Sequence, residues 1–192
     1  MRSRSSIRAA LPEELFALLH IRPMVEDDLP QVIAIDRRSF ALPWPESSYR
    51  FEMLENLSSF LKVADVMLPD ESRLIVGVVV VWMILDEAHI ATLAVDPNYR
   101  GQRIATRLMV SVMREIIRQQ ARLATLEVRE HNTTAQRLYQ KFGYKIVGRR
   151  SRYYKDNQED ALIMTIDGLG QNYLDWLDQG DWVKNSAEVG GL

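Results

Sequence analysis

The stretch LAVDPNYRGQRIA, residues 93–105, decides the fold of this 192-residue chain. In it a short apolar strand runs through a tight turn directly into an amphipathic helix. A loop that enters a helix points several free backbone N–H groups at one spot, and the helix dipole adds partial positive charge there. Phosphate and pyrophosphate bind readily at such a spot, so the stretch predicts an anion site.

The composition is that of a globular protein, and we expect a single folded domain. Hydrophobic residues make up 47% of the chain, which is enough to build a core. The net charge of −2 gives no general attraction to nucleic acid or to a membrane surface. The absence of cysteine excludes disulfides, thiolate metal sites and a cysteine nucleophile. The three histidines include no pair at helical spacing, so we expect no metal site and assign no role to His89 or His131.

The pattern along the chain predicts a central domain with two additions. Residues 1–20 form the expected N-terminal appendage, residues 21–167 the domain, and residues 168–192 a short helix and a tail. The apolar residues near the N-terminus are interrupted at residues 12–14, which is not the pattern of a signal peptide. The longest apolar run, residues 75–85, has about half the length of a membrane span. We therefore expect a cytoplasmic protein, while the oligomeric state is left open.

Hydrophobic periodicity and turn residues predict a mixed α/β domain whose first half is largely antiparallel. The expected strands are residues 21–24, 60–67, 73–85, 88–95, 123–128, 144–149 and 161–166. The expected helices begin after a cap at Asp27-Asp28, at about Pro45, at about Ile104, after a cap at Asn132 and near Tyr173. A dinucleotide-binding Rossmann fold is disfavoured because Gly-x-Gly-x-x-Gly is absent and the early strands lack βαβ spacing.

Glu127 lies inside an expected strand, where a charged side chain must face solvent or a partner. Strand alternation places it on the same side as Leu123 and Thr125. Asn132 can cap the next helix, and Tyr139 lies two turns along that helix on the same face. The side chains of Glu127, Asn132 and Tyr139 could therefore point into one site. The pattern taken alone favours a solvated glutamate, a core tyrosine and a simple helix cap.

A series of short motifs stands in a fixed order between about residues 21 and 166. They are LPW at 42–44, LDEA at 85–88, AVDP at 94–97, LEVR at 126–129, residues 132–139, FGY at 142–144, RYY at 152–154 and EDA at 159–161. In order and spacing they resemble the GNAT-fold acyl-CoA N-acyltransferases, and within them the RimI type, the ribosomal-protein-alanine N-acetyltransferases. The resemblance implies the GNAT fold, a mixed, mostly antiparallel sheet flanked by helices.

The resemblance implies acetyl-CoA as the co-substrate, with no metal. The pantetheine arm would pair with the backbone of Leu93, Ala94 and Val95, and the N–H of Ala94 or Val95 would polarise the thioester carbonyl. Asn132 would hold the cofactor or an ordered water. The pyrophosphate would lie on Gly101, Gln102, Arg103, Ile104, Ala105 and Thr106. This assignment agrees with the anion site that the turn predicts by itself.

One position departs from the family's turn pattern, Arg/Gln-x-x-Gly-x-Gly/Ala. The pattern falls on residues 100–105, where the central glycine is Arg103. Glycine lets a backbone approach a pyrophosphate without an intervening side chain. We expect that Arg103 keeps its N–H donor and that its side chain bends outward or pairs with phosphate.

The resemblance also implies the roles of the reacting groups. Glu127 would be the general base, directly or through water, and Tyr139 the acid that protonates the leaving CoA thiolate. The acceptor slot would be walled by Trp44, Tyr153 and Tyr154, with Glu87 a partner for the positive amine.

The acceptor must present a neutral amine. An α-amino group with a pKa of about 7.7–8.0 is about a tenth neutral at pH 7, while lysine is below about a thousandth. A protein or peptide N-terminus is therefore the expected acceptor. A GNAT enzyme for a small amine, such as a polyamine or an antibiotic, is the enzymatic alternative. A catalytically silent CoA-binding or partner-binding module is the other, and acetyl-CoA turnover separates it from both enzymes.

Overall fold

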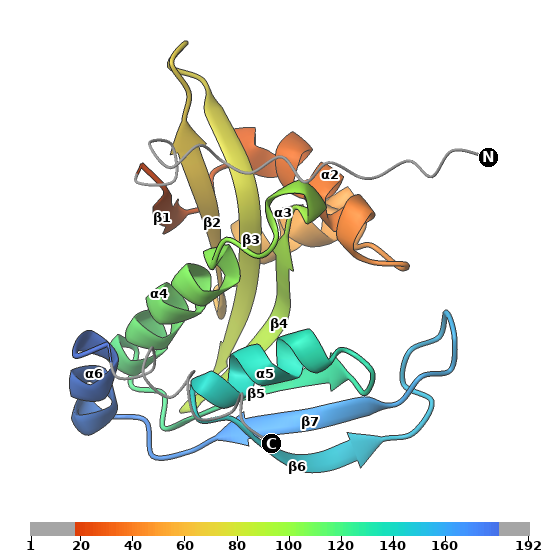
Figure 1. Ribbon diagram of the computed structural model, residues 1–192, viewed down its shortest axis with the longest axis vertical. Coiled ribbons are helices and arrows are strands. Elements are labelled where there is room, and N and C mark those ends of the chain that lie inside the picture. The colour runs from red at the N-terminus through yellow and green to blue at the C-terminus, as the bar shows by residue number, and fades with distance from the viewer. Residues whose placement is uncertain (1–17, 181–192) are drawn as a thin grey trace. The chain divides into compact units, whose positions relative to one another are not determined.

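The computed structural model describes residues 18–180 of the chain. Its strands are β1 (His20–Pro23), β2 (Ser59–Met67), β3 (Arg73–Ile84), β4 (Glu87–Val95), β5 (Leu123–Arg129), β6 (Lys145–Arg150) and β7 (Ala161–Ile166). Its α-helices are α2 (Leu29–Ser39), α3 (Glu46–Leu54), α4 (Ile104–Arg118), α5 (Thr133–Lys141) and α6 (Gln171–Asp178), and two short 3-10 turns lie at Glu26–Asp28 and Pro97–Tyr99. The strands follow the order β1-β2-β3-β4-β5-β7-β6 in one mixed, mostly antiparallel sheet (Figure 1).

The chain divides into two compact units. The described part of the first comprises residues 18–56, 61–79 and 93–108, and that of the second comprises residues 57–60, 80–92 and 109–180. Among residues 18–180, no helix has the length and apolar character that crossing a membrane requires.

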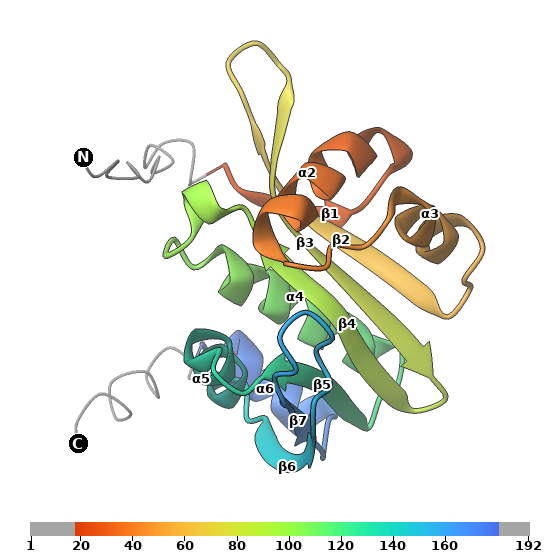
Figure 2. The same cartoon turned by 90° about the vertical axis from the view of Figure 1, so that its right-hand side faces the viewer.

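In the first unit, α2 packs beside β3, and Figure 2 shows both elements with the β2–β3 turn. The Gln31 amide fixes this contact, because it donates to the Arg73 carbonyl and accepts from the Ile75 N–H, each at 3.0 Å. β1 pairs antiparallel with β2, with Ile21 opposite Ala64. The core of this unit includes aliphatic side chains of α2, β2, β3 and α4, among them Leu29, Val32, Ile35, Val63, Val66, Val76, Val78 and Leu108.

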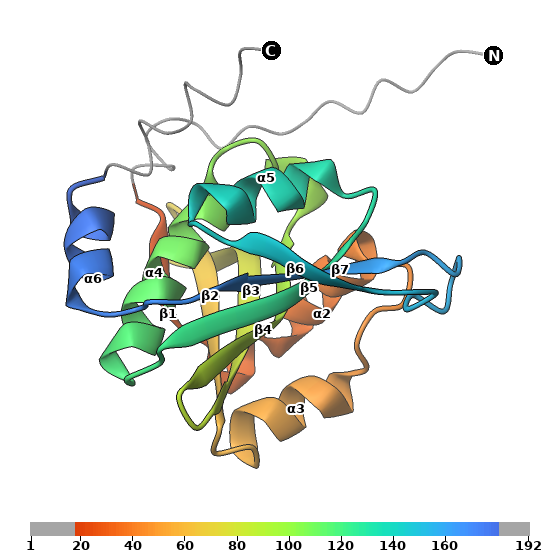
Figure 3. The same ribbon diagram turned by 90° about the horizontal axis from the view of Figure 1, so that it is seen from below.

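In the second unit, β5 lies between β4 and β7. Its pairing with β4 is parallel and joins His89 to Thr125, and its pairing with β7 is antiparallel and joins Glu127 to Ile163. Figure 3 shows α5 lying along one side of β5, β6 and β7. The buried side chains of this unit include Met109, Val112, Met113, Ile116, Ala124, Leu126, Phe142, Tyr144 and Met164.

The predicted elements are confirmed, with boundaries that shift by one or two residues. The alternation along β5 is also confirmed, since Ala124, Leu126 and Val128 are buried and the residues between them are half-buried. Asn132 caps α5 as predicted, because its side chain accepts from the Ala135 N–H at 3.1 Å. Residues 1–17 of the expected N-terminal appendage and the tail after residue 180 lie outside the described residues.

Asp28 occupies the N-cap position of α2, as the sequence predicts, but its side chain does not cap this helix. The Asp28 carboxylate accepts instead from both terminal nitrogens of Arg22, at 2.7 and 2.8 Å, and from the Val25 N–H at 2.9 Å. The two bonds from the charged guanidinium outweigh a bond to a helical N–H, and capping rules alone do not predict a partner in the preceding strand.

Gly77 of β3 marks a close approach of backbone and helix within the first unit. A Cβ at this position would lie 3.0 Å from Leu108, 3.1 Å from the Ala94 carbonyl oxygen and 3.3 Å from Ile104. The glycine therefore lets the end of β4 and the start of α4 come close to β3.

Changing Gly77 to alanine is expected to destabilise the protein by about 1–3 kcal/mol, because the added methyl group meets a backbone oxygen that cannot rotate away. Urea unfolding of the variant and the natural chain measures this difference. An unchanged free energy of unfolding would show that the close approach is not tight in solution.

Candidate active site

The predicted anion turn belongs to the first unit and is anchored by Asp96. This carboxylate is 4% exposed and accepts from the Asn98 N–H at 3.0 Å and from Arg38 Nη2 at 2.6 Å. The backbone N–H of Asp96 donates to the Val76 carbonyl at 3.0 Å. The turn is further fixed by Arg100, whose Nε donates to the Val95 carbonyl at 3.1 Å. The end of β4 and the entry to α4 are thus held in one conformation.

The turn itself has the conformation of an anion cradle. Gly101 and Arg103 both have left-handed backbone, with φ of 84° and 58°. α4 begins at Ile104, and the Arg103 carbonyl accepts from the Arg107 N–H at 3.0 Å. The N–H groups of the first helical turn therefore lack partners within the helix and carry the positive end of its dipole. This donor set fits a pyrophosphate.

The conformation also explains why a glycine stands at this position in the family pattern. Arg103 adopts the left-handed region, which costs a residue with a Cβ about 1–2 kcal/mol. Its side chain is exposed and has no hydrogen bond or ion pair within residues 18–180. Strain without a contact in the protein is typical of a functional position.

Replacing Arg103 with glycine is expected to raise the free energy of unfolding by about 1 kcal/mol, because glycine reaches this φ without strain. Arg103→Ala is the matched control: it removes the same side chain but keeps the Cβ, so it should leave stability nearly unchanged. Chemical denaturation of the three proteins measures the effect. Equal stabilities of the glycine and alanine variants would contradict a strained turn.

Glu127 lies at the centre of a charged cluster in the second unit. Its side chain is 11% exposed, so the solvated alternative is wrong. One carboxylate oxygen, Oε2, lies 3.1 Å from His89 Nε2, and the other, Oε1, lies 3.2 Å from Arg150 Nη2. His89 in turn stacks on the Trp82 ring, with 5.3 Å between ring centroids. The carboxylate is therefore held in place on both sides.

Sequence reasoning missed His89 and Arg150 as neighbours of Glu127. The parallel register places His89 opposite Thr125, two residues from Glu127 on the same side of β5. The antiparallel pairs of β5 with β7 and of β6 with β7 bring Arg150 to the same side. A correct strand order with its register would have found both residues. The residue pattern of a single strand does not reveal partners on neighbouring strands.

Tyr139 of α5 is buried, as the core alternative proposed, with 7% exposure. Its ring packs against Tyr144 at 5.9 Å between centroids. Burial raises the pKa of the Tyr139 phenol, and the nearby Tyr154 phenol raises this pKa further. Tyr139 therefore holds its proton at neutral pH.

Tyr154, in the hairpin loop between β6 and β7, connects these two groups. Burial raises the pKa of Tyr154 to about 12, against the opposite effect of Arg129 and with further increases from Tyr153 and the Glu127 carboxylate. Tyr154 thus interacts electrostatically with both Glu127 and Tyr139. Its ring lies edge-on to that of Tyr153 at 5.3 Å, and Arg150 lies over the Tyr153 ring at 5.4 Å. Arg150 also pairs with Glu127, so the two tyrosines of the loop lie on the side of the sheet that carries Glu127.

The other predicted residues are placed as follows. Glu87 opens β4 and Asn132 caps α5, both in the second unit, whereas residues 93–95 and 101–106 belong to the first. Trp44 also belongs to the first unit, where its backbone N–H donates to the buried Asp36 carboxylate at 2.6 Å. Asp36 accepts from the Tyr49 hydroxyl as well, at 2.8 Å.

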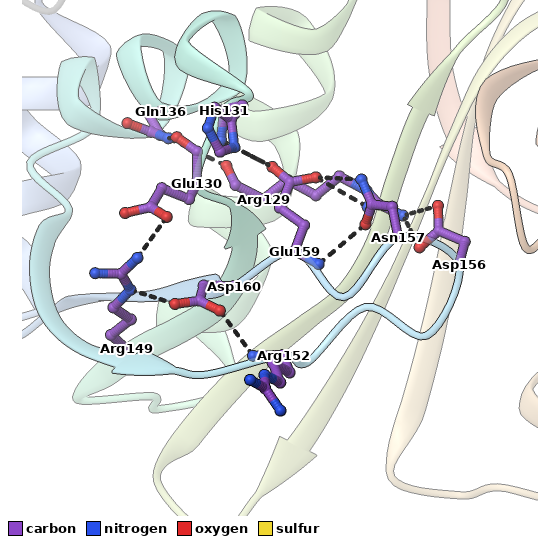
Figure 4. A network of polar contacts seen from close by, with 10 residues as sticks. All are labelled: Arg129, Glu130, His131, Gln136, Arg149, Arg152, Asp156, Asn157, Glu159 and Asp160. Carbon is purple, nitrogen blue, oxygen red and sulfur yellow. Dashed lines mark hydrogen bonds and ion pairs between the residues drawn. The ribbon is translucent and has the colours of Figure 1, made fainter.

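A polar network surrounds the hairpin loop of residues 151–160 (Figure 4). Glu159 accepts from Arg129 Nη1 at 3.0 Å and from the His131 N–H at 2.9 Å. The backbone bond from His131 is the largest influence that lowers the pKa of Glu159, which lies at about 2. In the described part of the chain no cluster of His, Asp or Glu is arranged to hold a metal ion.

The network makes folding dependent on pH. The pKa of Glu159 is lowered from 4.5 to about 2 in the folded protein, so its stabilising contribution is present above pH 4.5 and is lost as the pH falls toward 2. Urea unfolding at pH 6 and pH 3 should show a smaller loss of stability for Glu159→Gln than for the natural chain. Equal losses in the two proteins would exclude this contribution.

Comparison with known proteins agrees with this architecture. Residues 29–144 match the model of the acetyltransferase (GNAT) family. The chain is 30% identical over 141 residues to the ribosomal protein bS18-alanine N-acetyltransferase of Escherichia coli (strain K12). This match covers 72% of this chain and 90% of that protein. It is 37% identical over 146 residues to a Bacillus subtilis (strain 168) protein to which the same activity is attributed, spanning 76% and 93% of the two.

A solved structure shows the same fold. The crystal structure of the ribosomal-protein-S18-alanine N-acetyltransferase from Escherichia coli matches with a TM-score of 0.68 and 27% identity, and the match covers 80% of this chain and 95% of that one. The predicted fold class is confirmed.

Proposed function

We propose that this chain, which belongs to the acetyltransferase (GNAT) family, transfers the acetyl group of acetyl-CoA to the α-amino group of a protein N-terminus. The observation that carries the proposal is similarity over nearly the whole length of relatives named for acetylating an N-terminal alanine of ribosomal protein bS18. A ribosomal protein that begins with alanine is therefore the acceptor we propose.

The anion turn of the first unit is the proposed site of the CoA pyrophosphate. Its donors are the backbone N–H groups of residues 101–106, at the start of α4. The backbone of residues 93–95 would pair with the pantetheine arm, and the N–H of Ala94 or Val95 would donate to the thioester carbonyl. Acetyl-CoA supplies the activated acetyl group.

Glu127 is the proposed general base. Its carboxylate is positioned by His89 and Arg150, and it takes the proton that the α-amine must lose, directly or through a water. Tyr139 is the proposed acid, because burial keeps its phenol protonated and able to donate to the leaving thiolate. Tyr154 and Tyr153 of the second unit would wall the acceptor slot, and Glu87 of the same unit would face the positive amine.

Glu127→Gln is expected to lower kcat by about a hundredfold or more with an Ala-starting peptide, because the amide cannot accept a proton. The affinity for acetyl-CoA, measured by calorimetry, should change less than about twofold. Release of free CoA measures turnover. Glu130→Gln is the matched control, because it removes a half-buried carboxylate just after β5 that pairs with Arg149.

Two other outcomes would overturn the assignment. Turnover with spermidine alone, and not with any peptide, would assign the enzyme to small amines. Tight acetyl-CoA binding without turnover of any acceptor would show a silent CoA-binding module.

A further inference from the structure

We propose that Arg129 is a positioning residue that holds Tyr154 and the hairpin loop of residues 151–160 in the form that receives the acceptor peptide. This inference rests on the proposed function, and it adds a residue that acts on the acceptor side through Tyr154. All the groups involved belong to the second unit.

The Arg129 guanidinium forms hydrogen bonds through its terminal nitrogens and contacts an aromatic ring with its planar face. Nη2 donates to the two carboxylate oxygens of Asp156 at 2.9 Å each, and Nη1 donates to Glu159 at 3.0 Å and to Asn157 at 3.1 Å. The face of the same group covers the Tyr154 ring, with 3.8 Å from Cζ to the ring centroid. One side chain at the end of β5 therefore contacts three loop residues (Figure 4) and, in addition, the Tyr154 ring.

This geometry is of the kind in which an ion pair has a real effect. Isolated surface pairs contribute little, but a bidentate fork within a network loses less entropy for each bond it forms. The side chains involved are 26% exposed for Arg129, 18% for Asp156 and 9% for Glu159. The loop backbone follows the same arrangement, since the Tyr154 N–H donates to the Glu159 carbonyl at 3.0 Å.

Tyr154 connects this clamp to the surroundings of Glu127, because its ring lies edge-on to Tyr153, and Arg150, the partner of Glu127, lies over the Tyr153 ring. Its phenol interacts electrostatically with the Glu127 carboxylate and with the Tyr139 phenol, which are the proposed base and acid. Arg129 lies two residues from Glu127 on the same side of β5. A shift of the Tyr154 ring would therefore change the wall beside the acceptor amine and leave the anion turn of the first unit unchanged.

A second arginine of the same network provides a matched control. Arg149 pairs with Glu130 and with Asp160, each at 2.6 Å, and so ties the other side of the hairpin to the same region. Its removal breaks two ion pairs of the network but neither the fork to Asp156 nor the stack on Tyr154. A role in loop stability alone would make the Arg129 and Arg149 variants alike.

The experiment compares Arg129→Gln, Arg129→Lys and Arg149→Gln in steady-state acetylation of an Ala-starting peptide. Arg129→Gln should raise KM for the peptide by about tenfold and leave KM for acetyl-CoA within about twofold. Arg129→Lys keeps the charge but loses the fork and the planar stack, so it should resemble the glutamine variant. Arg149→Gln should leave both KM values within about twofold. Equal effects of Arg129→Gln and Arg149→Gln, or rescue by lysine, would overturn the proposal.

A double-mutant cycle tests whether Arg129 acts through Tyr154. Adding Arg129→Gln to a Tyr154→Ala protein should change KM for the peptide by less than about twofold, whereas independent roles would multiply the two effects. Amide hydrogen exchange at Tyr154 and Gln158, about tenfold faster in Arg129→Gln, reports the clamp without any turnover. If the natural chain acetylates the peptide but amide exchange in Arg129→Gln is unchanged, the clamp is refuted and the proposed function is not. If exchange is faster in Arg129→Gln but the natural chain acetylates no peptide, the proposed function is refuted and the clamp is not.

Discussion

The parallel pairing of β4 with β5 is the constraint on which the second unit depends. Its register joins His89 to Thr125 and so brings an imidazole to the Glu127 carboxylate. The opposite edge of β5 pairs antiparallel with β7, whose hairpin partner β6 carries Arg150 to the other carboxylate oxygen. A one-residue slip of either pairing would turn these side chains to the wrong side of the sheet. The arrangement of the proposed base is therefore a property of the sheet rather than of a flexible loop.

The same sheet explains why the hairpin loop can be both exposed and ordered. Arg129 ends β5 and Ala161 begins β7, and these two residues are paired. The loop between β6 and β7 therefore leaves the sheet beside the Arg129 guanidinium, which donates hydrogen bonds to Asp156 and Glu159 of the loop. The Arg129 guanidinium lies over the Tyr154 ring, so the aromatic side chain of this loop is held against the end of β5.

Local features of the fold could be predicted from sequence, and features that depend on register could not. The cap at Asn132, the alternation along β5 and the tight turn from β4 into α4 follow from short-range chemistry, and the structure has all three. The partners of Glu127 come from strands that are distant in sequence, so residue pattern alone favoured a solvated side chain. The Asp28 side chain does not cap α2 for the same reason, because Arg22 reaches it from β1. The roles of Glu127 and Tyr139 came from family resemblance, and the structure adds the contacts that suit them to those roles.

The central claim is that the acceptor is an α-amine. The most direct measurement is mass spectrometric mapping of the acetylated position in a peptide that begins with alanine and contains an internal lysine. The account predicts a single acetyl group on the N-terminal nitrogen, because only that amine is appreciably neutral near pH 7. Acetylation of the lysine side chain, with the N-terminal amine left free, would contradict it.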